Sequence, residues 1–346
     1  MTVRTVLVAQ TQVPLAHGGA EIHTDGLLHA LKQRGFRADL ITLPFNWYRP
    51  VHVLAHAFAW RLLELEEIDG ERVDLVIGTR YPSYFLRHPN KIIWLIHQFR
   101  EVYDLYGTSY SFPISSVEEL EIRESIIRSD QIALTEARKI YTNSRNTGAR
   151  LKRFNNIESE TLYVPPKLTG KYRCEPSEGY ILSVGRLDRL KRVDLLIRAM
   201  QYVTAPVRCI VVGEGKQQPE LAQLVAQLGL QQRVLFAGRV TDTQLLDLYA
   251  RTSAVYFAPY DEDFGLVTVE AFASGKPVLT ARDSGGVLEL VKNNVTGLIC
   301  QPDAEALASA IDQIISRSKW AAELGAAGRE RVRDITWDTV VDKLTS

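Results

Sequence analysis

The stretch AVYFAPYDEDFGLVTVEAFASGKPVL, residues 254–279, holds a short apolar strand, a loop, a helix of mostly small residues and a second strand. The loop carries Glu262, and the helix carries Glu270, eight positions further on. A helix start attracts anions, because its first N–H groups lack partners within the helix and the helix dipole favours negative charge there. Two carboxylates beside such a start therefore raise the question of which groups they face.

The same order of strand and helix continues through the chain. Strands are predicted in the first half at 5–10, 38–43, 73–78, 91–97, 139–144 and 160–165, with helices at 19–34, 51–67, 117–137 and 145–154. Strands in the second half, each followed by a helix, are predicted at 180–185, 207–213, 233–238, 254–259, 277–281 and 296–300. This alternation is typical of parallel α/β sheets.

The segment 164–179, rich in proline, glycine and charge, separates the halves and is interpreted as a linker. A length of 346 residues also favours two domains. We predict an α/β protein with two Rossmann-like parallel-sheet domains, 1–167 and 168–334, followed by a terminal segment, 335–346. Ligands of open parallel sheets bind at the carboxyl ends of the strands, so the two domains are expected to face each other across a cleft.

Composition narrows the class of protein. The 41 basic and 41 acidic residues cancel, which disfavours nucleic-acid binding as the main activity. The cysteines, Cys174, Cys209 and Cys300, lack the spacing of metal ligands, and the last two are predicted to be buried thiols. The start of the sequence shows no signal peptide, and no stretch reaches about 18 apolar residues. We therefore expect a cytoplasmic protein.

Gly18 and Gly19 lie between the first predicted strand and its helix, where two glycines let a phosphate or a sugar approach the backbone. A plain strand–helix turn is the alternative. The stretch VVGEGKQQ, residues 211–218, matches neither the dinucleotide motif nor a P-loop, because Gln217 and Gln218 stand where those motifs need other residues. Nicotinamide and P-loop nucleotides are thus disfavoured.

Arg186 and Lys191 follow the strand 180–185 and lie at or near the start of the next helix. Cations at a helix N-terminus oppose the dipole, which makes sense if an anion such as a diphosphate binds between them. The alternative is a pair of surface cations balanced by Asp188 and Asp194.

His97 stands at the carboxyl end of the strand 91–97. A histidine there can bond a sugar hydroxyl or take part in proton transfer, although a lone histidine at a strand end is often structural.

The opening stretch offers the backbone N–H groups of Gly265, Leu266 and Val267 at the start of the helix 266–274. Glu262 is suited to accept hydrogen bonds from sugar hydroxyls, and Glu270 is suited to bind a ribose diol with two oxygens. Because carboxylates repel phosphate, both should touch the neutral ends of the ligand.

The string Asp261-Glu262-Asp263 contains D-x-D, yet two carboxylates alone are weak evidence for Mg²⁺. The cationic pair already serves the diphosphate, so we predict no metal and no other cofactor.

Together these residues resemble the retaining, nucleotide-sugar-dependent glycosyltransferases of the GT-B fold, in family four. The resemblance rests on SVGRLDRLKRVDLLI (183–197), which carries Arg186 and Lys191, on VVGEG (211–215), and on the glutamates of 258–279 in E-x7-E spacing. Outside Gly18–Glu21 and His97 the first domain is less similar, as expected if that half selects the acceptor.

By that similarity Glu262 holds the donor sugar, Glu270 the ribose, and Arg186 with Lys191 the diphosphate. His97 matches the active-site histidine of the family, and Gly18 and Gly19 would close over the donor. The resemblance further places Gly213, Phe264, Gly265, Leu266 and Val267 around the donor, and makes 335–346 a helix that crosses back to the first domain. The family usually has Lys-Gly where this chain has Lys191-Arg192, which leaves the local backbone less certain.

Two stretches suit an anionic lipid or a lipid-diphosphate acceptor at a membrane surface. The run 137–157 has six basic residues and no acidic one, and 44–63 combines aromatic and basic residues. A solvated helix face and a core helix are the alternatives.

The resemblance implies a metal-independent, retaining hexosyltransferase that uses a nucleoside-diphosphate sugar and a hydroxyl acceptor, either a glycan or a lipid-linked glycan. The alternatives are an epimerase or phosphorylase of the GT-B type and a non-catalytic protein that binds sugar nucleotides. The sequence identifies neither the base nor the sugar nor the acceptor.

Overall fold

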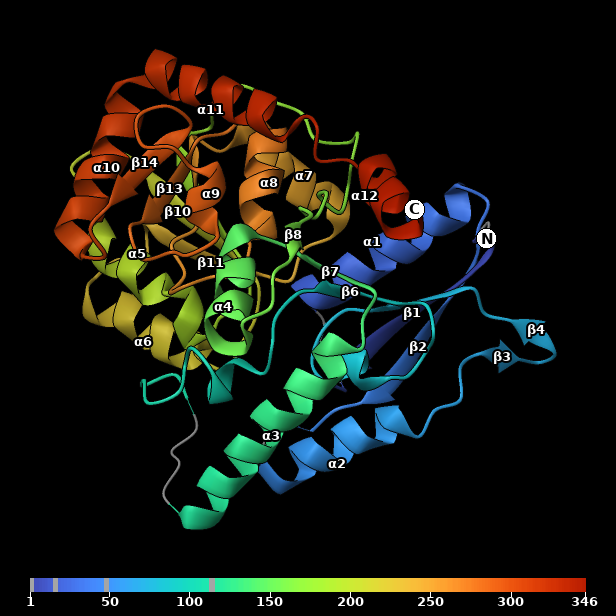
Figure 1. Cartoon of the computed structure of the whole chain (residues 1–346). Helices are drawn as coiled ribbons and strands as arrows, with labels where there is room; N and C mark the ends of the chain where they lie inside the picture. Colours follow the sequence, from blue (N-terminus) through green and yellow to red (C-terminus); the bar gives the residue numbers. More distant parts are fainter. Residues whose placement is uncertain (1–2, 15–17, 47–49, 112–115) are drawn as a thin grey trace. The chain divides into compact units, whose positions relative to one another are not determined.

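The computed structural model describes residues 3–14, 18–46, 50–111 and 116–346 (Figure 1). The chain divides into two compact units: the first contains Met1–Val164 and Thr336–Ser346, and the second contains Pro165–Ile335. The boundary lies a few residues before the one expected from the sequence. The segment 165–179 belongs to the second unit, where Tyr172 is buried.

The first unit is built on a six-stranded parallel sheet of order β2-β1-β5-β6-β7-β8. Its strands are β1 (Thr5–Gln12), β2 (Arg37–Pro44), β5 (Leu75–Gly78), β6 (Lys91–Leu95), β7 (Lys139–Thr142) and β8 (Glu160–Thr161). Its helices are α1 (Gly19–Gln33), α2 (Pro50–Arg61), α3 (Val117–Thr135), α4 (Arg145–Asn155) and α12 (Trp337–Thr345), with the 3₁₀ turns η1 (Ser83–Phe85) and η2 (Arg100–Val102).

Alternation along the strands separates the two faces of this sheet. Leu7 and Ile93 pack with Trp60 of α2 and Ile126 of α3 in one apolar core. Trp94, the next residue on β6, points the other way and contacts His23 of α1 and Trp337 of α12. Helices α1 and α12 therefore cover one face, and α2 and α3, which pack along each other, cover the opposite face (Figure 1).

The second unit repeats the architecture with a parallel sheet of order β11-β10-β9-β12-β13-β14. Its strands are β9 (Tyr180–Val184), β10 (Arg208–Val212), β11 (Val234–Gly238), β12 (Ala254–Tyr256), β13 (Val278–Ala281) and β14 (Gly297–Cys300). Its helices are α5 (Val193–Met200), α6 (Gln218–Gln227), α7 (Asp242–Arg251), α8 (Leu266–Ala273), α9 (Val287–Leu290), α10 (Ala304–Ser316) and α11 (Ser318–Val332), with the 3₁₀ turn η3 (Arg189–Lys191).

The predicted fold class, two α/β domains with parallel sheets, is confirmed. In each sheet the strand order reverses beside its first strand: between β1 and β5 in the first unit, and between β9 and β12 in the second. The loops at such a switch point diverge to opposite faces and leave a crevice at the carboxyl edge, where open α/β sheets bind their ligands. One position at the carboxyl edge of each sheet is therefore the expected place for a ligand.

The structure differs from the sequence prediction in two local features. The helix predicted at 51–67 ends at Arg61, and Glu67–Ile68 (β3) and Glu71–Arg72 (β4) form a small antiparallel hairpin. Cys300, predicted as a buried thiol like Cys209, is only half-buried, because it is the last residue of the edge strand β14. Among the described residues, no helix combines the length and the apolar character needed to cross a membrane.

Candidate functional site

The switch point of the second unit is made by the loops that follow β9, β10 and β12. Backbone hydrogen bonds join all three: Leu187 N–H donates to Glu214 O at 3.0 Å, and Tyr260 N–H donates to Leu190 O at 2.8 Å. The loop after β9 is thus fixed on both sides. Side chains on these loops share one carboxyl edge of the sheet.

Lys191 and Glu262 meet at this edge. Lys191 Nζ donates to Glu262 Oε2 at 2.5 Å, and the two side chains are 20% and 18% exposed. Lys191 also lies over the ring of Phe257, 5.6 Å from its centroid. The pair is partly desolvated, which strengthens its attraction over that of a surface ion pair. The sequence placed these residues around one ligand, and the structure brings them into direct contact.

Gly213 permits the close approach of the loops after β9 and β10. Its φ of +125° is rare for residues with a side chain, and a Cβ at this position would lie 1.9 Å from the carbonyl oxygen of Gly185. Glycine is therefore required here for packing between loops. This requirement stands whether or not Gly213 also contacts the donor.

Arg186 is far more exposed than Lys191 or Glu262. Its side chain is 64% exposed and lies 3.7 Å from Asp188. Asp188 accepts a hydrogen bond from Lys191 N–H at 3.3 Å and so caps the turn η3. Arg186 is thus held loosely in solvent beside the loop that carries Lys191.

Helix α8 begins as the sequence predicts, at Leu266, after Gly265 in a left-handed conformation with φ of +86°. A Cβ on Gly265 would lie 2.7 Å from Cε1 of Phe257, so a larger residue would clash as well as strain the backbone. Phe264 is buried, and Leu266 and Val267 are half-buried. The N–H groups of the first turn of α8 precede the first bond within the helix, as at every helix start.

Glu270 lies within α8 and is 6% exposed. The hydroxyl of Tyr249, on α7, donates to Glu270 Oε2 at 2.7 Å. Burial raises the pKa of Glu270 to about 7, although the hydroxyl bond from Tyr249 acts in the opposite direction. One carboxylate oxygen of Glu270, the residue predicted to bind the ribose, is therefore already bonded to another residue of its own domain.

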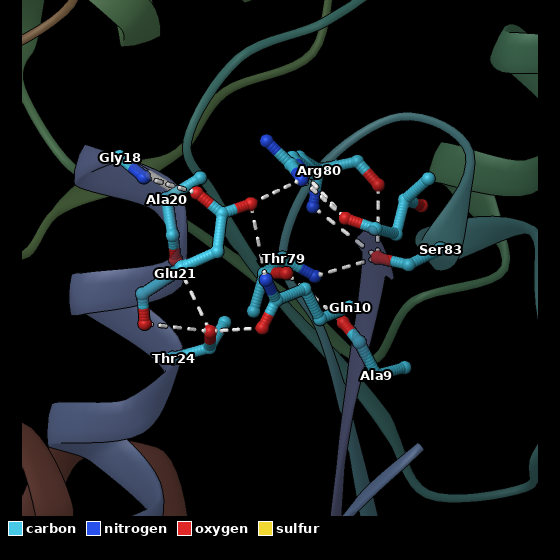
Figure 2. A network of polar contacts seen from close by, with 10 residues as sticks. Ala9, Gln10, Gly18, Ala20, Glu21, Thr24, Thr79, Arg80 and Ser83 are labelled. Atoms are coloured by element: carbon cyan, nitrogen blue, oxygen red, sulfur yellow. Dashed lines mark hydrogen bonds and ion pairs between the residues drawn. The ribbon is translucent and has the colours of Figure 1, made fainter. Parts of the chain in front are cut away.

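The first unit has a comparable constellation at its own switch point (Figure 2). Gly18 caps α1 in an extended conformation, and its N–H donates to Glu21 Oε2 at 2.8 Å. The other oxygen of Glu21 accepts from Arg80 at 2.8 Å and from Gln10 Nε2 at 3.4 Å. The exposed Gly19 and half-buried Gly18 thus begin a helix whose third residue is a buried carboxylate.

Arg80 lies on the loop after β5 and bonds to both β1 and α1, on the other side of this switch point. Its guanidinium donates to the carbonyl of Thr11, at the end of β1, as well as to Glu21 of α1. The Arg80 and Glu21 side chains are only 13% and 10% exposed. Ser83 Oγ accepts from Thr79 N–H at 3.1 Å and donates to Arg80 O at 2.8 Å, which fixes the turn (Figure 2).

His97 follows β6 in the first unit, half-buried, with Nδ1 2.6 Å from the carbonyl of Gln98. The side chain of Gln98 donates to Asn155 of α4, and Tyr103 donates to Asp130 of α3 at 2.7 Å. The segment after His97 is therefore bonded to two helices. His97 and the two glycines belong to the first unit, and the remaining predicted residues belong to the second.

The basic run 137–157 is largely paired with acceptors from outside it. Lys139 contacts Glu160 at 2.9 Å, Lys152 contacts Glu158 at 2.7 Å, and Arg138 donates to the carbonyl of Ser346. On α2, Val53, Ala57 and Trp60 are buried while Phe58 is 57% exposed. One side of α2 thus packs in the core, as the core-helix alternative expected, and contact of this stretch with lipid stays a prediction. Trp47, Tyr48 and Arg49 of the aromatic stretch, like His17, lie outside the described residues.

The sequence did not point to three residues that hold parts of these sites in place. Arg80 bonds to Glu21, and Tyr249 bonds to Glu270. Arg192 bonds to the loop after β12. Arg80 had a signal, since it follows a predicted strand near its carboxyl end. Tyr249 had none, because it reaches Glu270 from a different helix, and an amphipathic pattern does not say which tyrosine meets which acid. In the described part of the chain, no group of three or more His, Cys, Asp or Glu is placed to hold a metal ion.

Residues 167–331 match the family described as "Glycosyl transferases group 1". The D-inositol 3-phosphate glycosyltransferase of Rhodococcus erythropolis is 34% identical over 181 residues, 49% of this chain and 41% of that protein. The chain spans about two-fifths of the length of such curated relatives.

Two solved structures show the fold over nearly the whole chain. Sucrose-phosphate synthase from Thermosynechococcus elongatus has a TM-score of 0.77 at 21% identity, covering 98% of this chain and 97% of its own. Anabaena HepE in complex with UDP and glucose has a TM-score of 0.71 at 19% identity, with 98% of each chain covered.

Residues 167–331 match the group 1 glycosyl transferases, and the whole chain has the GT-B fold. The resemblance to the family-four glycosyltransferases of the GT-B fold is confirmed, and the retaining mechanism stays a prediction.

Proposed function

We propose that this chain is a retaining glycosyltransferase that moves a hexosyl unit from a nucleoside-diphosphate sugar to a hydroxyl acceptor, without a metal ion. The observation that carries the proposal is the Lys191–Glu262 pair, beside the glycine-started helix α8, at the switch point of a group 1 glycosyl transferase domain. A cation, a carboxylate and a helix start together match the diphosphate and the hydroxyls of a sugar nucleotide.

In this proposal the α8 start and Lys191 bind the diphosphate, with Arg186 turning inward from solvent. Glu262 exchanges its bond with Lys191 for the hydroxyls of the donor sugar. Glu270 binds the ribose diol while Tyr249 keeps its other contact. Each carboxylate then touches a neutral part of the ligand, and the phosphates face only positive charge and N–H groups.

The chemistry follows from charge movement. The bond between the anomeric carbon and the diphosphate oxygen breaks, and the acceptor oxygen forms a new bond to the same carbon on the same face. The acceptor proton passes to an oxygen of the departing diphosphate, so no protein nucleophile is required. Lys191 and the dipole of α8 stabilise the negative charge that develops on the leaving group.

The first unit supplies the acceptor side. We assign His97 to a hydroxyl of the transferred sugar or the acceptor, and Gly18 and Gly19 to close backbone contact with the donor. The exposed apolar side of α2, with Phe58, supports an acceptor carried on a lipid surface. A non-catalytic sugar-nucleotide-binding protein is the rival function.

The first test is a screen of UDP-, GDP- and TDP-sugars by thermal shift, beginning with UDP-glucose because Anabaena HepE was solved with that compound. A donor at a hundredfold over its Kd stabilises the folded protein by about 2.7 kcal/mol. Hydrolysis and transfer are then followed with and without EDTA, and the anomeric configuration of the product is read by NMR.

Glu262→Gln is expected to abolish turnover, whereas Glu178→Gln, the same change at an exposed ion pair with Arg251, should have no effect. Binding with neither hydrolysis nor transfer would favour the non-catalytic rival. An inverted product, or activity lost in EDTA and restored by Mg²⁺, would refute the retaining or the metal-independent part respectively.

A further inference from the structure

Arg192 occupies a backbone conformation that normally belongs to glycine. Its φ and ψ are +49° and +43°, in the left-handed region, at the junction between η3 and α5. A residue with a Cβ is strained in this region, so a non-glycine residue persists there only when its surroundings fix it. Arg192 directly follows Lys191, which belongs to the candidate site.

The side chain of Arg192 shows what fixes it. Its guanidinium donates to the carbonyls of Ala258 at 2.7 Å and Pro259 at 2.9 Å, directly after β12. It also forms a two-pronged bond with both carboxylate oxygens of Asp283, at 2.8 and 2.7 Å. With the side chain only 13% exposed, these charge-assisted bonds are shielded from water. Arg192 thus ties the Lys191 loop to the loops after β12 and β13.

The segment that carries Glu262 is strained and held in the same way. Asp261 has a φ of +40°, and its N–H donates to Asp283 O at 2.9 Å. Glu262 N–H donates to Ser284 O at 3.3 Å, and Gly286 N–H donates to Glu262 O at 2.8 Å. The backbone of Glu262 therefore runs along the segment that begins at Asp283, whose carboxylate Arg192 grips.

Two strained non-glycine residues thus stand next to the two members of the central pair, Arg192 beside Lys191 and Asp261 beside Glu262. Strain of this kind concentrates where a structure must hold a precise geometry. A glycine at position 192 would adopt the same turn without strain but would make none of these four side-chain hydrogen bonds. The arginine therefore links its own loop to the loops after β12 and β13, although its backbone is strained.

We propose that Arg192, with Asp283, is a positioning residue that sets Lys191 and Glu262 at the distance needed for transfer from the donor. This inference rests on the proposed function and adds to it a residue that touches neither donor nor acceptor. It predicts that loss of the guanidinium damages turnover more than it damages either stability or nucleotide binding.

The test uses the full chain and three variants: Arg192→Gly, Arg192→Lys and Arg233→Lys. Arg192→Gly relieves the strain and removes the contacts, and Arg192→Lys keeps the charge but lacks the fork that grips Asp283. Arg233 is the matched control, since its guanidinium donates to four backbone carbonyls of the same domain, those of Met200, Val203, Ala205 and Val207.

We expect Arg192→Gly to lower kcat at least tenfold while the affinity for free nucleoside diphosphate stays within about threefold of the wild type. Arg192→Lys should recover part of kcat. Arg233→Lys should lower the melting temperature as much as Arg192→Gly or more, with kcat unchanged. Hydrogen exchange should accelerate at Asp261 and Glu262 in Arg192→Gly alone, because their N–H groups donate to carbonyls of the segment that Arg192 holds through Asp283.

Wild-type kcat in a folded Arg192→Gly protein would overturn the inference while leaving the proposed function intact. Equal losses of kcat in Arg192→Gly and Arg233→Lys would also overturn it, because general loosening would then be the cause. A wild-type protein that neither binds nor turns over any donor of the UDP, GDP and TDP panel would overturn the proposed function, and this inference with it.

Discussion

The two switch points use the same pair of charges in opposite order. In the first unit the carboxylate, Glu21, lies on the helix after the first strand, and the cation, Arg80, follows the strand across the reversal. In the second unit the cation, Lys191, follows the first strand, and the carboxylate, Glu262, follows the strand across the reversal. In each domain, therefore, an ion pair joins the elements on the two sides of the switch point.

The two pairs differ in the other hydrogen bonds that their members make and in their exposure to solvent. Glu21 also accepts from Gly18 N–H and Gln10, and Arg80 also donates to a main-chain carbonyl, so both groups are committed to the fold (Figure 2). Lys191 and Glu262 hold each other across two loops and keep more of their surface exposed. The comparison teaches that one pair fixes a helix start, while the other is the pair that, in the proposed function, exchanges its internal bond for a ligand.

Replacement of Lys191 should produce the largest effect. Lys191→Met is expected to lower kcat/KM by about 10²- to 10³-fold, the scale found when one preorganised electrostatic group is removed from a transition state. Its melting temperature should fall less than that of Arg80→Met, because Glu262 stays more exposed to water than Glu21 once its cation is removed. Steady-state kinetics and calorimetry on one preparation measure both. If the variant is much less stable but its folded fraction keeps full activity, then Lys191 has a structural role like that of Arg80.

Replacement of Arg80 should show the reverse pattern. Arg80→Met leaves the carboxylate of Glu21 buried without its cation, and breaking a buried pair in this way costs about 3 kcal/mol of unfolding free energy. Donor affinity should remain near the wild-type value, because most of the residues proposed to bind the donor belong to the second domain. Urea unfolding and nucleotide titration provide the two readouts. Unchanged stability would contradict the structural assignment of this pair.

Two buried carboxylates, one in each domain, predict a pH dependence of stability. Burial raises the pKa of Asp130 and of Glu270 to about 7, so each is protonated in the folded protein at pH 5 while ionised in the unfolded chain. Their contribution to stability is complete below the unfolded pKa values near 4 and is lost as the pH rises to about 7.

The free energy of unfolding should therefore fall between pH 5 and pH 8. Asp130→Asn and Glu270→Gln should each flatten that fall by about 2–3 kcal/mol, since one pKa unit corresponds to about 1.4 kcal/mol. Urea titrations at both pH values measure the slope. A slope that neither substitution alters would show that other groups cause it.

The smallest effect separates these two acids by function. If Glu270 binds the ribose diol as a carboxylate, then binding of free UDP near pH 6.5 should release part of a proton, measurable by calorimetry in buffers of different ionisation enthalpy. Glu270→Gln should abolish the release and weaken UDP about tenfold. Asp130→Asn should keep both quantities at wild-type values. Proton release that persists in Glu270→Gln would remove this residue from the ribose site.

The fold could be predicted from the sequence because buried parallel strands are continuous β-branched runs and are separated by clear helix periods. The hairpin β3–β4 escaped that reasoning, although Asp69-Gly70 between its strands is a strong hairpin signal. Its strands are two residues each and exposed, so they carry no apolar pattern.

The candidate site could be predicted only in part. Lys191 and Glu262 lie on loops after adjacent strands, and strand order brings such loops together. The role of Arg192 could not be predicted, because it depends on a backbone angle and on carbonyls of a segment 66 positions away. Sequence spacing locates the loops, but only side-chain geometry shows which residue joins them.

Helix α12 completes the first domain although the second domain precedes it in the chain. Trp337 fits over Gly26 of α1, where a Cβ would lie 2.2 Å from its ring, and stacks edge-on near Trp94. During synthesis, the ribosome must therefore produce all of the second domain before Trp337 emerges to cover α1 and β6. The domain that is made first is completed last, because the contacts of Trp337 with α1 and Trp94 form only after the second domain has been translated.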